Sequence, residues 1–317
     1  MGMLSVMIKS QVYGRFLPSG NRAAATIALV AAILFWAGNS VAGRMSIGVV
    51  PPVALAFWRW FFAFVCLLLI TWRQLHEHRK TILCYRYRLL MLAVLSITTF
   101  NTLLYLAAQS TQAVNIALIQ TSLPLVTIVL SIFFLNEIPR LRQVIGLLII
   151  LAGLLYVICR CEWQQLLLLK SHQGDLYMLV AVTFWGLYSV LYKRFAIPLP
   201  GIVILTVLVG IGMPVLLPFY LWEYSLVGGF AVTFQSVALL VYVTVFASIL
   251  SYLAWNNGVR VLGSSSASLF NSLMPVFVAF LAFLFLGESL HSYHFVGGGL
   301  ILTGLWLALH RLVMYEV

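Results

Sequence analysis

Charged side chains are scarce in this sequence. Asp, Glu, Lys and Arg together make up 8% of the 317 residues, whereas soluble domains typically contain about 25%. Hydrophobic residues account for 63%. A soluble chain of this length needs a polar surface, and this composition cannot supply one. The scarcity of charge therefore excludes an ordinary soluble domain and predicts an integral membrane protein.

Groups suited to proton, metal or nucleophilic chemistry are missing from the apolar stretches. The 7 Asp and Glu and the 6 His all lie between those stretches or at their ends. The four cysteines lack the spacing of zinc ligands. Because catalysis needs such groups within hydrogen-bond reach of one another, we expect no enzyme, no metal and no cofactor.

The sequence does contain a series of apolar runs, each of about 20 residues and long enough to cross a bilayer. Such runs fold as helices in lipid because a helix satisfies its own backbone hydrogen bonds. The first run is too long for the apolar part of a signal peptide, so we keep it as a membrane helix. The sequence thus predicts an all-α membrane protein with ten transmembrane helices. The predicted spans are 23–43, 53–72, 89–108, 113–135, 143–159, 175–192, 199–221, 235–255, 265–286 and 294–310.

Lysine and arginine are distributed unequally between the two sides of the predicted bundle. Of the 18 Lys and Arg, Arg59 lies within a span, and one side holds only Arg44, Arg160 and Lys170. All the others fall on the opposite side. Loops rich in Lys and Arg stay in the cytoplasm. The bias predicts a multi-pass protein of the cell (inner) membrane with both termini cytoplasmic. It also explains the net charge of +11 without a nucleic-acid partner.

The sequence repeats itself at an offset of about 150 residues. Pro124 and Glu137 recur as Pro275 and Glu288, both 151 residues later. Further pairs follow in the same order at nearly the same offset, which indicates a duplication. These pairs are Trp36–Trp185, Tyr105–Tyr252, Gly146–Gly297 and Gly153–Gly304.

The duplication divides the chain into two five-helix repeats, at 23–160 and 174–311, after an N-terminal extension at 1–22 that we expect in the cytoplasm. An odd number of spans in each repeat places the second repeat upside down relative to the first. Inverted repeats are a known basis of alternating access, with the substrate between the halves near the membrane centre. The predicted architecture is therefore two inverted five-helix repeats, and the predicted activity is transport.

Short motifs within the repeats are similar to those of a known family. They are Phe35-Trp36-Ala37-Gly38-Asn39, Phe57-Trp58-Arg59-Trp60, and the paired endings Pro124…Asn136-Glu137 and Pro275…Gly287-Glu288. As a set they resemble the EamA-type family of the drug/metabolite transporter superfamily over nearly all of residues 23–310. The resemblance implies ten helices, a central cavity and export of metabolites such as amino acids. It leaves the substrate open, and residues 1–22 fall outside it.

The repeated prolines mark one candidate site. A proline cannot donate a backbone hydrogen bond to the carbonyl four residues earlier, so Pro124 frees the carbonyl of Gln120 and Pro275 frees that of Asn271. Both freed carbonyls belong to residues with amide side chains, and paired interruptions point to the binding site of a transporter. We predict that Gln120 and Asn271 bind substrate and that the prolines act as gates or kinks. The alternative is a packing kink, with the amides bonded to neighbouring helices.

Polar and aromatic side chains on four other spans complete the candidate site. A polar stripe on a membrane helix should face protein or water, and an aromatic wall suits an amphipathic substrate. Hydrogen bonding between helices and ordinary aromatic packing are the alternatives. The predicted lining residues are Trp36, Asn39, Asn101, Tyr105, Trp185, Tyr188, Tyr252 and Asn256.

Arg59 is the one charge predicted inside a span. It lies six residues into the span 53–72, about 9 Å from its end at a rise of 1.5 Å per residue. Two roles are open: contact with an anionic group of the substrate, or snorkelling to the membrane surface. The family resemblance includes an arginine here, which favours a structural role.

Together these features predict export of small amphipathic metabolites, amino acids and aromatic ones among them, by alternating access through a central cavity. A sugar-phosphate or nucleotide-sugar antiporter of the same fold is the first alternative, although phosphate recognition would want several buried cations. A membrane-embedded enzyme is the alternative from another class. The expected partners are a small-molecule substrate and the lipid bilayer, and the expected state is a monomer or a weak homo-oligomer.

Overall fold

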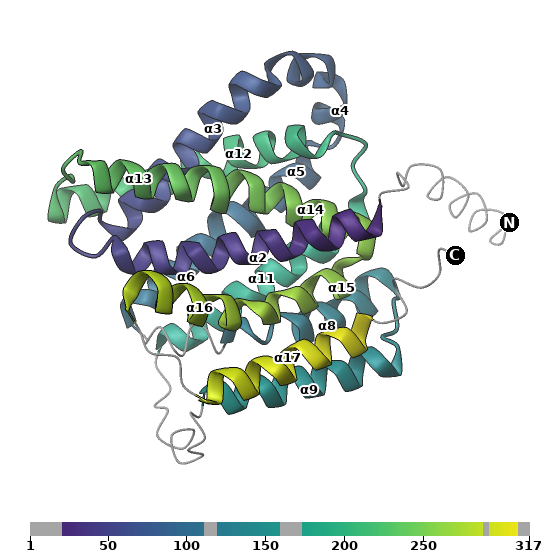
Figure 1. Cartoon of the computed structure of the whole chain (residues 1–317). Helices are drawn as coiled ribbons and strands as arrows, with labels where there is room; N and C mark the ends of the chain where they lie inside the picture. Colours follow the sequence, from purple (N-terminus) through teal and green to yellow (C-terminus); the bar gives the residue numbers. More distant parts are fainter. Residues whose placement is uncertain (1–20, 111–118, 159–172, 288–291, 310–317) are drawn as a thin grey trace, which may run out of the picture.

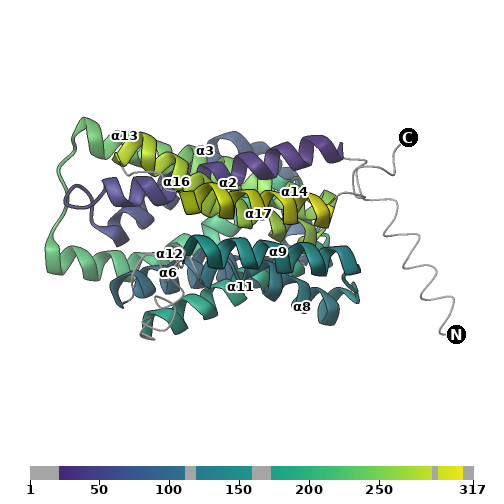
Figure 2. The same cartoon turned by 60° about the horizontal axis from the view of Figure 1, so that its bottom comes forward.

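A computed structural model of the chain describes residues 21–110, 119–158, 173–287 and 292–309. Within these ranges every regular element is a helix, as the composition predicted. The long helices run side by side along roughly one direction (Figure 1), and a turned view shows them in more than one layer (Figure 2).

Eight helical segments are long and apolar enough to cross a membrane. Each falls on a predicted span, as do two shorter apolar helices, α8 (Leu123–Leu135) and α9 (Leu141–Ile158). The chain is therefore a multi-pass membrane protein. The count of ten spans stays a prediction, because part of 113–135 lies outside the described residues. The eight segments lie on α2 (Arg22–Met45), α3 (Pro52–Glu77), α5–η1–α6 (Arg86–Ala93, Val94–Thr99, Phe100–Ser110), α11 (Gln173–Phe195), α12 (Gly201–Val227), α13–η2–α14 (Phe234–Tyr242, Val243–Leu250, Ser251–Leu262), α15–η3–α16 (Ser264–Leu269, Phe270–Leu273, Met274–Leu286) and α17 (Ser292–Leu309).

Proline precedes two of these helices at repeated positions. Pro51 precedes α3 with φ −57° and ψ 144°, and Pro200 precedes α12 with φ −56° and ψ 140°. Proline fits a helix start because its φ is already fixed near this value and its missing N–H has no helical partner there. The two prolines are 149 residues apart, the offset of Trp36 and Trp185. The duplication therefore extends to local backbone geometry.

The helices α8 and α16 end in the same backbone conformation. Asn136 follows α8 with φ 55°, and Gly287 follows α16 with φ 68°, both left-handed. Glycine and asparagine adopt this conformation most readily, and it ends a helix by bonding its last carbonyls. The repeated Asn136-Glu137 and Gly287-Glu288 motif thus specifies a helix end.

The long spans are interrupted at matched positions. The π-helical stretches η1 and η2 lie within the third and eighth predicted spans, and π-helical turns are frequent at functional sites. The 3₁₀ stretch η3 lies directly before α16. Pro124 and Pro275 lie in the first turns of α8 and α16, where proline is tolerated. Each proline therefore follows a break in its span, whereas the sequence alone suggested a kink within a continuous helix.

The helices α9 and α17 pack antiparallel with backbone close to backbone (Figures 1 and 2). A Cβ atom at Gly146 would lie 2.5 Å from the carbonyl oxygen of Gly304, and one at Gly153 would lie 2.8 Å from that of Gly297. Only glycine permits so close an approach. The offset of 151 residues carries Gly146 onto Gly297 and Gly153 onto Gly304. The repeat therefore maps the contact between Gly146 and Gly304 onto the contact between Gly297 and Gly153. A two-fold relation between the halves requires this.

The helices α3 and α12 form a second pair of exchanged contacts. The rings of Phe57 and Tyr220 stack with their centroids 4.6 Å apart, and the hydroxyls of Thr71 and Thr206 are 3.1 Å apart. Phe57 and Thr206 are 149 residues apart, and so are Thr71 and Tyr220. The repeat thus maps the contact between Phe57 and Tyr220 onto the contact between Thr206 and Thr71. The first is an aromatic stack and the second is a hydrogen bond.

Candidate functional site

Aromatic side chains from four helices meet inside the bundle, and we call this set the aromatic cluster. Its members are Trp36 of α2, Trp60 of α3, Trp185 and Tyr188 of α11, and Tyr252 and Trp255 of α14. The centroid of the Trp185 ring lies 5.6 Å from Trp36 and 5.3 Å from Tyr252. These separations are in the range of favourable aromatic contact. The structure therefore brings together four of the predicted lining residues from α2, α11 and α14.

Two members of the cluster, Trp60 and Trp255, are absent from the predicted site. The ring of Trp60 lies 5.1 Å from Tyr252, and that of Trp255 lies 5.4 Å from Trp36. Trp255 also donates from Nε1 to Ser189 Oγ at 3.1 Å. Trp255 follows Tyr252 by three residues, a spacing that places both on one helix face. That spacing was the signal available in the sequence.

Polar groups border the aromatic cluster. The hydroxyl of Tyr188 donates to Asn256 Oδ1 at 2.6 Å, and Trp36 Nε1 donates to the carbonyl oxygen of Ala247 at 3.0 Å. Asn256 is buried, and its Nδ2 has no hydrogen-bond partner among the described residues; the same holds for Trp60 Nε1. A buried donor without an acceptor is costly. The cluster thus offers two donors to a ligand that carries acceptor atoms.

The two proline sites contact each other directly. Asn271 Nδ2 donates to the carbonyl oxygen of Gln120 at 3.2 Å, and this carbonyl lies directly before the break that precedes α8. In this conformation the Asn271 amide therefore joins the two interrupted spans. Only the backbone of Gln120 takes part in the bond, so its side chain is not needed for it.

For three other predicted residues, the structure gives only their place on a helix. Asn39 is partly buried on α2, three residues after Trp36. Asn101 and Tyr105 belong to α6, and their side chains lie outside the described part of the structure. At the start of α6, the ring of Phe100 lies 5.0 Å from that of Trp185. The helix is thus adjacent to the cluster, and the binding roles of all three residues stay predictions.

Arg59 is buried inside the bundle. Its side chain is 6% exposed, and its guanidinium carbon lies 4.8 Å from the centroid of the Trp60 ring, within the range of a cation–π contact. The Nε atom has no hydrogen-bond partner among the described residues. Arg59 thus adjoins the aromatic cluster through Trp60, and its role stays a prediction.

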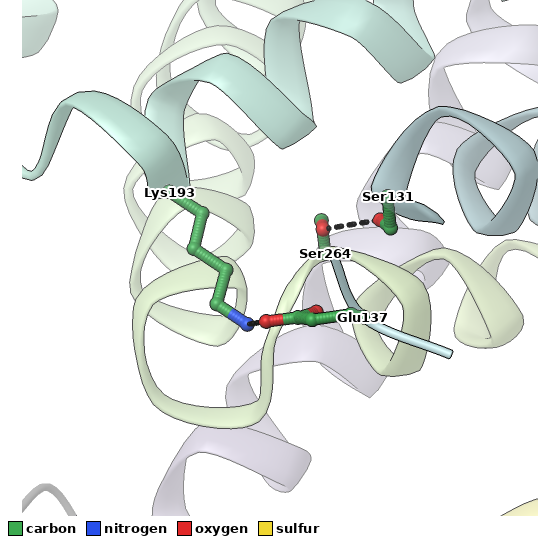
Figure 3. Close-up of polar contacts among 4 residues, drawn as sticks. All are labelled: Ser131, Glu137, Lys193 and Ser264. Atoms are coloured by element: carbon green, nitrogen blue, oxygen red, sulfur yellow. Dashed lines mark hydrogen bonds and ion pairs between the residues drawn. The ribbon is translucent and has the colours of Figure 1, made fainter. Parts of the chain in front are cut away.

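Polar contacts join three segments at one end of the bundle, and we call it the ion-pair end (Figure 3). Lys193 of α11 forms an ion pair with Glu137, which follows α8. The hydroxyls of Ser131 of α8 and Ser264 of α15 are 3.0 Å apart. A partly exposed ion pair is worth about 1 kcal/mol or less. The contacts therefore stabilise this arrangement of the three segments only weakly, and separating the segments costs little free energy.

The opposite end, which we call the Glu223 end, holds a cavity of about 1000 Å³ between the α2–α3 and α12–α13 connections. The carboxylate of Glu223 lines this cavity and accepts hydrogen bonds from the backbone N–H groups of Val53 at 2.9 Å and Ala54 at 2.6 Å. The first turn of a helix leaves such N–H groups without partners, and a negative charge suits a helix N-terminus. The end of α12 therefore caps the start of α3.

The repeat counterpart of Glu223 is Gln74, 149 residues earlier. At the same offset, the start of α12 is the repeat equivalent of the start of α3. Gln74 would therefore be the residue to cap α12. The Oε1 atom of Gln74 is buried and has no hydrogen-bond partner among the described residues. The cap between α3 and α12 is thus formed at one end by a carboxylate and is missing at the other.

Replacing Glu223 by alanine is expected to lower the free energy of unfolding by about 1 to 2 kcal/mol, the usual cost of losing a helix N-cap. Glu223→Gln retains one acceptor and should lose less than half as much. Thermal unfolding in detergent micelles measures both. If Glu223→Ala is as stable as the unchanged protein, the cap contributes nothing.

Comparisons with known proteins agree over most of the chain. The model of the EamA-like transporter family matches residues 23–159 and 172–310. YyaM, an uncharacterized transporter of Bacillus subtilis strain 168, is 27% identical over 269 residues, which cover 84% of this chain and 87% of YyaM. An uncharacterized transporter of Archaeoglobus fulgidus is 26% identical over 285 residues, which cover 88% of this chain and 95% of that protein.

A solved crystal structure matches with a TM-score of 0.70 at 18% identity, covering 94% of this chain and 100% of that chain. Likeness at this level of identity concerns the fold alone. It shows that the arrangement of helices described above occurs in another protein over its whole length.

Proposed function

Since the chain belongs to the EamA-like transporter family, we propose that it exports small amphipathic metabolites, with amino acids, aromatic ones among them, as the leading substrate class. The observation that carries the proposal is the aromatic cluster with two donors, Asn256 Nδ2 and Trp60 Nε1, that have no partner among the described residues. An apolar wall with a few polar groups suits an amphipathic molecule. The rings take the apolar part of the substrate, and the donors take its carboxylate.

Transport proceeds by alternating access between two inverted five-helix halves, at 23–160 and 174–311, which make ten spans. The exchanged contacts of α9 with α17 and of α3 with α12 support the inversion, because inverted repeats are related by a two-fold axis in the membrane plane. The aromatic cluster combines side chains of both halves. A rocking of one half against the other therefore changes which side of the membrane reaches the cluster.

The ion-pair end faces the cytoplasm of the inner membrane, and both termini lie on that side, in keeping with the bias of Lys and Arg. The described conformation is then closed towards the cytoplasm by the Glu137–Lys193 and Ser131–Ser264 contacts. The cavity at the Glu223 end leads outward. Loading of substrate from the cytoplasm requires the contacts at the ion-pair end to separate.

The substrate class is tested by measuring uptake of a panel of labelled amino acids into proteoliposomes that contain the purified protein. We expect uptake of at least one member, with aromatic amino acids among the best. Exchange of phosphate esters without uptake of any amino acid would instead favour the sugar-phosphate or nucleotide-sugar antiporter. Protein-free vesicles provide the baseline for both measurements.

Asn271→Asp is expected to lower the initial transport rate about tenfold, because it keeps the size of the side chain but loses the donor to the Gln120 carbonyl and leaves two acceptors facing each other. The rate is measured in proteoliposomes at equal protein content, for the panel member transported best. Gln120→Ala is the matched comparison, since it keeps the backbone carbonyl: an unchanged rate means that only this carbonyl takes part, and a loss means that the Gln120 side chain binds substrate as predicted. Equal losses in both variants would show that the bond between the spans is not what matters.

A further inference from the structure

A second cavity lies at the ion-pair end, apart from the aromatic cluster. Its volume is about 330 Å³, many times the share of about 30 Å³ that one water occupies in the liquid. It is bounded by the α8–α9 connection, the first turn of α9, the end of α11, the start of α15 and the end of α17. The polar lining residues are Glu137, Arg140, Arg142, Gln143, Lys193, Ser265 and Ser266.

The lining is strongly basic. Arg140, Arg142 and Lys193 face one carboxylate, Glu137, and that carboxylate is already paired with Lys193. Among the described residues, neither the Arg140 nor the Arg142 guanidinium has a hydrogen-bond or ion-pair partner. Arg194, the neighbour of Lys193, differs because it donates to the carbonyl oxygen of Phe134 at 2.8 Å. Arg140 is exposed and Arg142 is partly buried, so the cavity presents two guanidinium groups that no described residue pairs.

A serine side chain lines the same cavity. Ser266 is 5% exposed, and no hydrogen bond of its side chain connects it to the described residues. Its hydroxyl is therefore free to donate to a ligand in the cavity. Guanidinium groups and a hydroxyl, all donors, together suit a planar or tetrahedral oxyanion, which arginine binds through paired N–H groups.

The remaining lining is apolar. Ile138, Leu262 and Leu307 border the basic residues, and the side chain of Ile138 is 84% exposed. A ligand that carries an apolar or ester-linked portion beside its oxyanion therefore finds contact for both parts. Basic pockets between transmembrane helices bind anionic lipid head groups in this way.

We propose that this cavity is a binding site for a phosphate-type oxyanion, held by Arg140, Arg142 and Ser266. Its ligand is the head group of an anionic phospholipid or a soluble phosphate ester. Lys193 belongs both to this site and to the ion pair with Glu137, so the anion and the Glu137 carboxylate compete for one cation. Removing the carboxylate therefore strengthens binding of the anion.

The test compares lipids retained by the purified protein in native mass spectrometry, after incubation with equal amounts of phosphatidylglycerol and phosphatidylcholine. We expect at least a threefold preference for phosphatidylglycerol, lost in the double variant Arg140→Gln/Arg142→Gln, reduced in Ser266→Ala, and increased in Glu137→Gln. Inorganic phosphate added at millimolar concentration distinguishes the sources. If phosphate displaces the lipid or raises the melting temperature by itself, a soluble ester is the ligand; if it does neither, the lipid is.

The matched control is Arg79→Gln/Lys80→Gln on α4 (Arg79–Cys84), which removes the same charge from exposed residues that do not line the cavity. It should keep the preference. Equal loss in both double variants would mean that general surface charge holds the anion, and it would overturn the proposal. No preference in the unchanged protein, together with no stabilisation by phosphate, would overturn it as well. If the double variant does not fold, Ser266→Ala takes its place, because this small neutral change should also reduce the preference for phosphatidylglycerol.

Discussion

Gly304→Ala will lower the free energy of unfolding by about 3 kcal/mol. A Cβ atom at this position would lie 2.6 Å from the carbonyl oxygen of Gly146 and 2.9 Å from the backbone N of Ile150. Backbone atoms cannot turn aside as a flexible side chain can, so α9 and α17 must move apart along their whole contact. Overpacking of this kind costs about 1 to 3 kcal/mol, occasionally more. Thermal or denaturant unfolding in detergent micelles measures the loss.

Gly299→Ala is the matched control on the same helix. Gly299 is exposed, and a Cβ atom there would meet no atom within 4 Å. Alanine has the higher helix propensity by about 1 kcal/mol, so this variant should be as stable as the unchanged protein or slightly more stable. If both alanine variants behave alike, close packing of α9 on α17 does not contribute to stability.

Trp185→Ala is expected to raise the substrate KM at least about tenfold, which corresponds to about 1.4 kcal/mol of binding free energy. The Trp185 ring contacts Trp36, Tyr188, Tyr252 and Trp255, so its removal takes away the centre of the proposed binding surface. Trp185→Phe keeps an aromatic face and should recover a large part of the affinity. The assay is concentration-dependent uptake in proteoliposomes, normalised to folded protein.

Trp72→Ala controls for the loss of a tryptophan as such. Trp72 is on α3 and 67% exposed, away from the cluster. Its removal should leave the KM unchanged. If the Trp185→Ala variant folds normally and its KM is unchanged, the aromatic cluster does not recognise the substrate. The proposed site would then have to lie elsewhere.

The sequence predicted helices well because their signal is local and repeated. The apolar runs give the spans directly, and the offset between Pro124 and Pro275 also relates the helix ends at Asn136 and Gly287, which share a left-handed backbone. The glycines at 146 and 304 stood out as repeat markers. Their direct contact was not foreseen, because a constant offset says which positions are equivalent and not which positions touch.

The candidate site was predicted only in part. Trp36 and Trp185 are predicted as parts of an aromatic wall and Tyr252 as part of a polar stripe on another span, and the structure gathers all three. The partners of Glu223 and Lys193 could not be predicted, because each bond joins segments far apart in the sequence. The π-helical stretches η1 and η2 were missed as well, since a widened turn leaves no recognisable pattern in the residue types.

The difference between Glu223 and Gln74 has a thermodynamic consequence. In a transporter made of two identical inverted halves, a two-fold rotation about an axis in the membrane plane would convert the inward-open state into the outward-open state. The two states would then have equal energy and equal populations. Every position at which the halves differ shifts that balance. A carboxylate that accepts two N–H bonds at one end, opposite an amide oxygen that has no partner among the described residues at the other, is such a difference. Each 1.4 kcal/mol changes the ratio of the two populations tenfold, so under the proposed alternating-access mechanism this pair of positions shifts the resting state of the empty carrier.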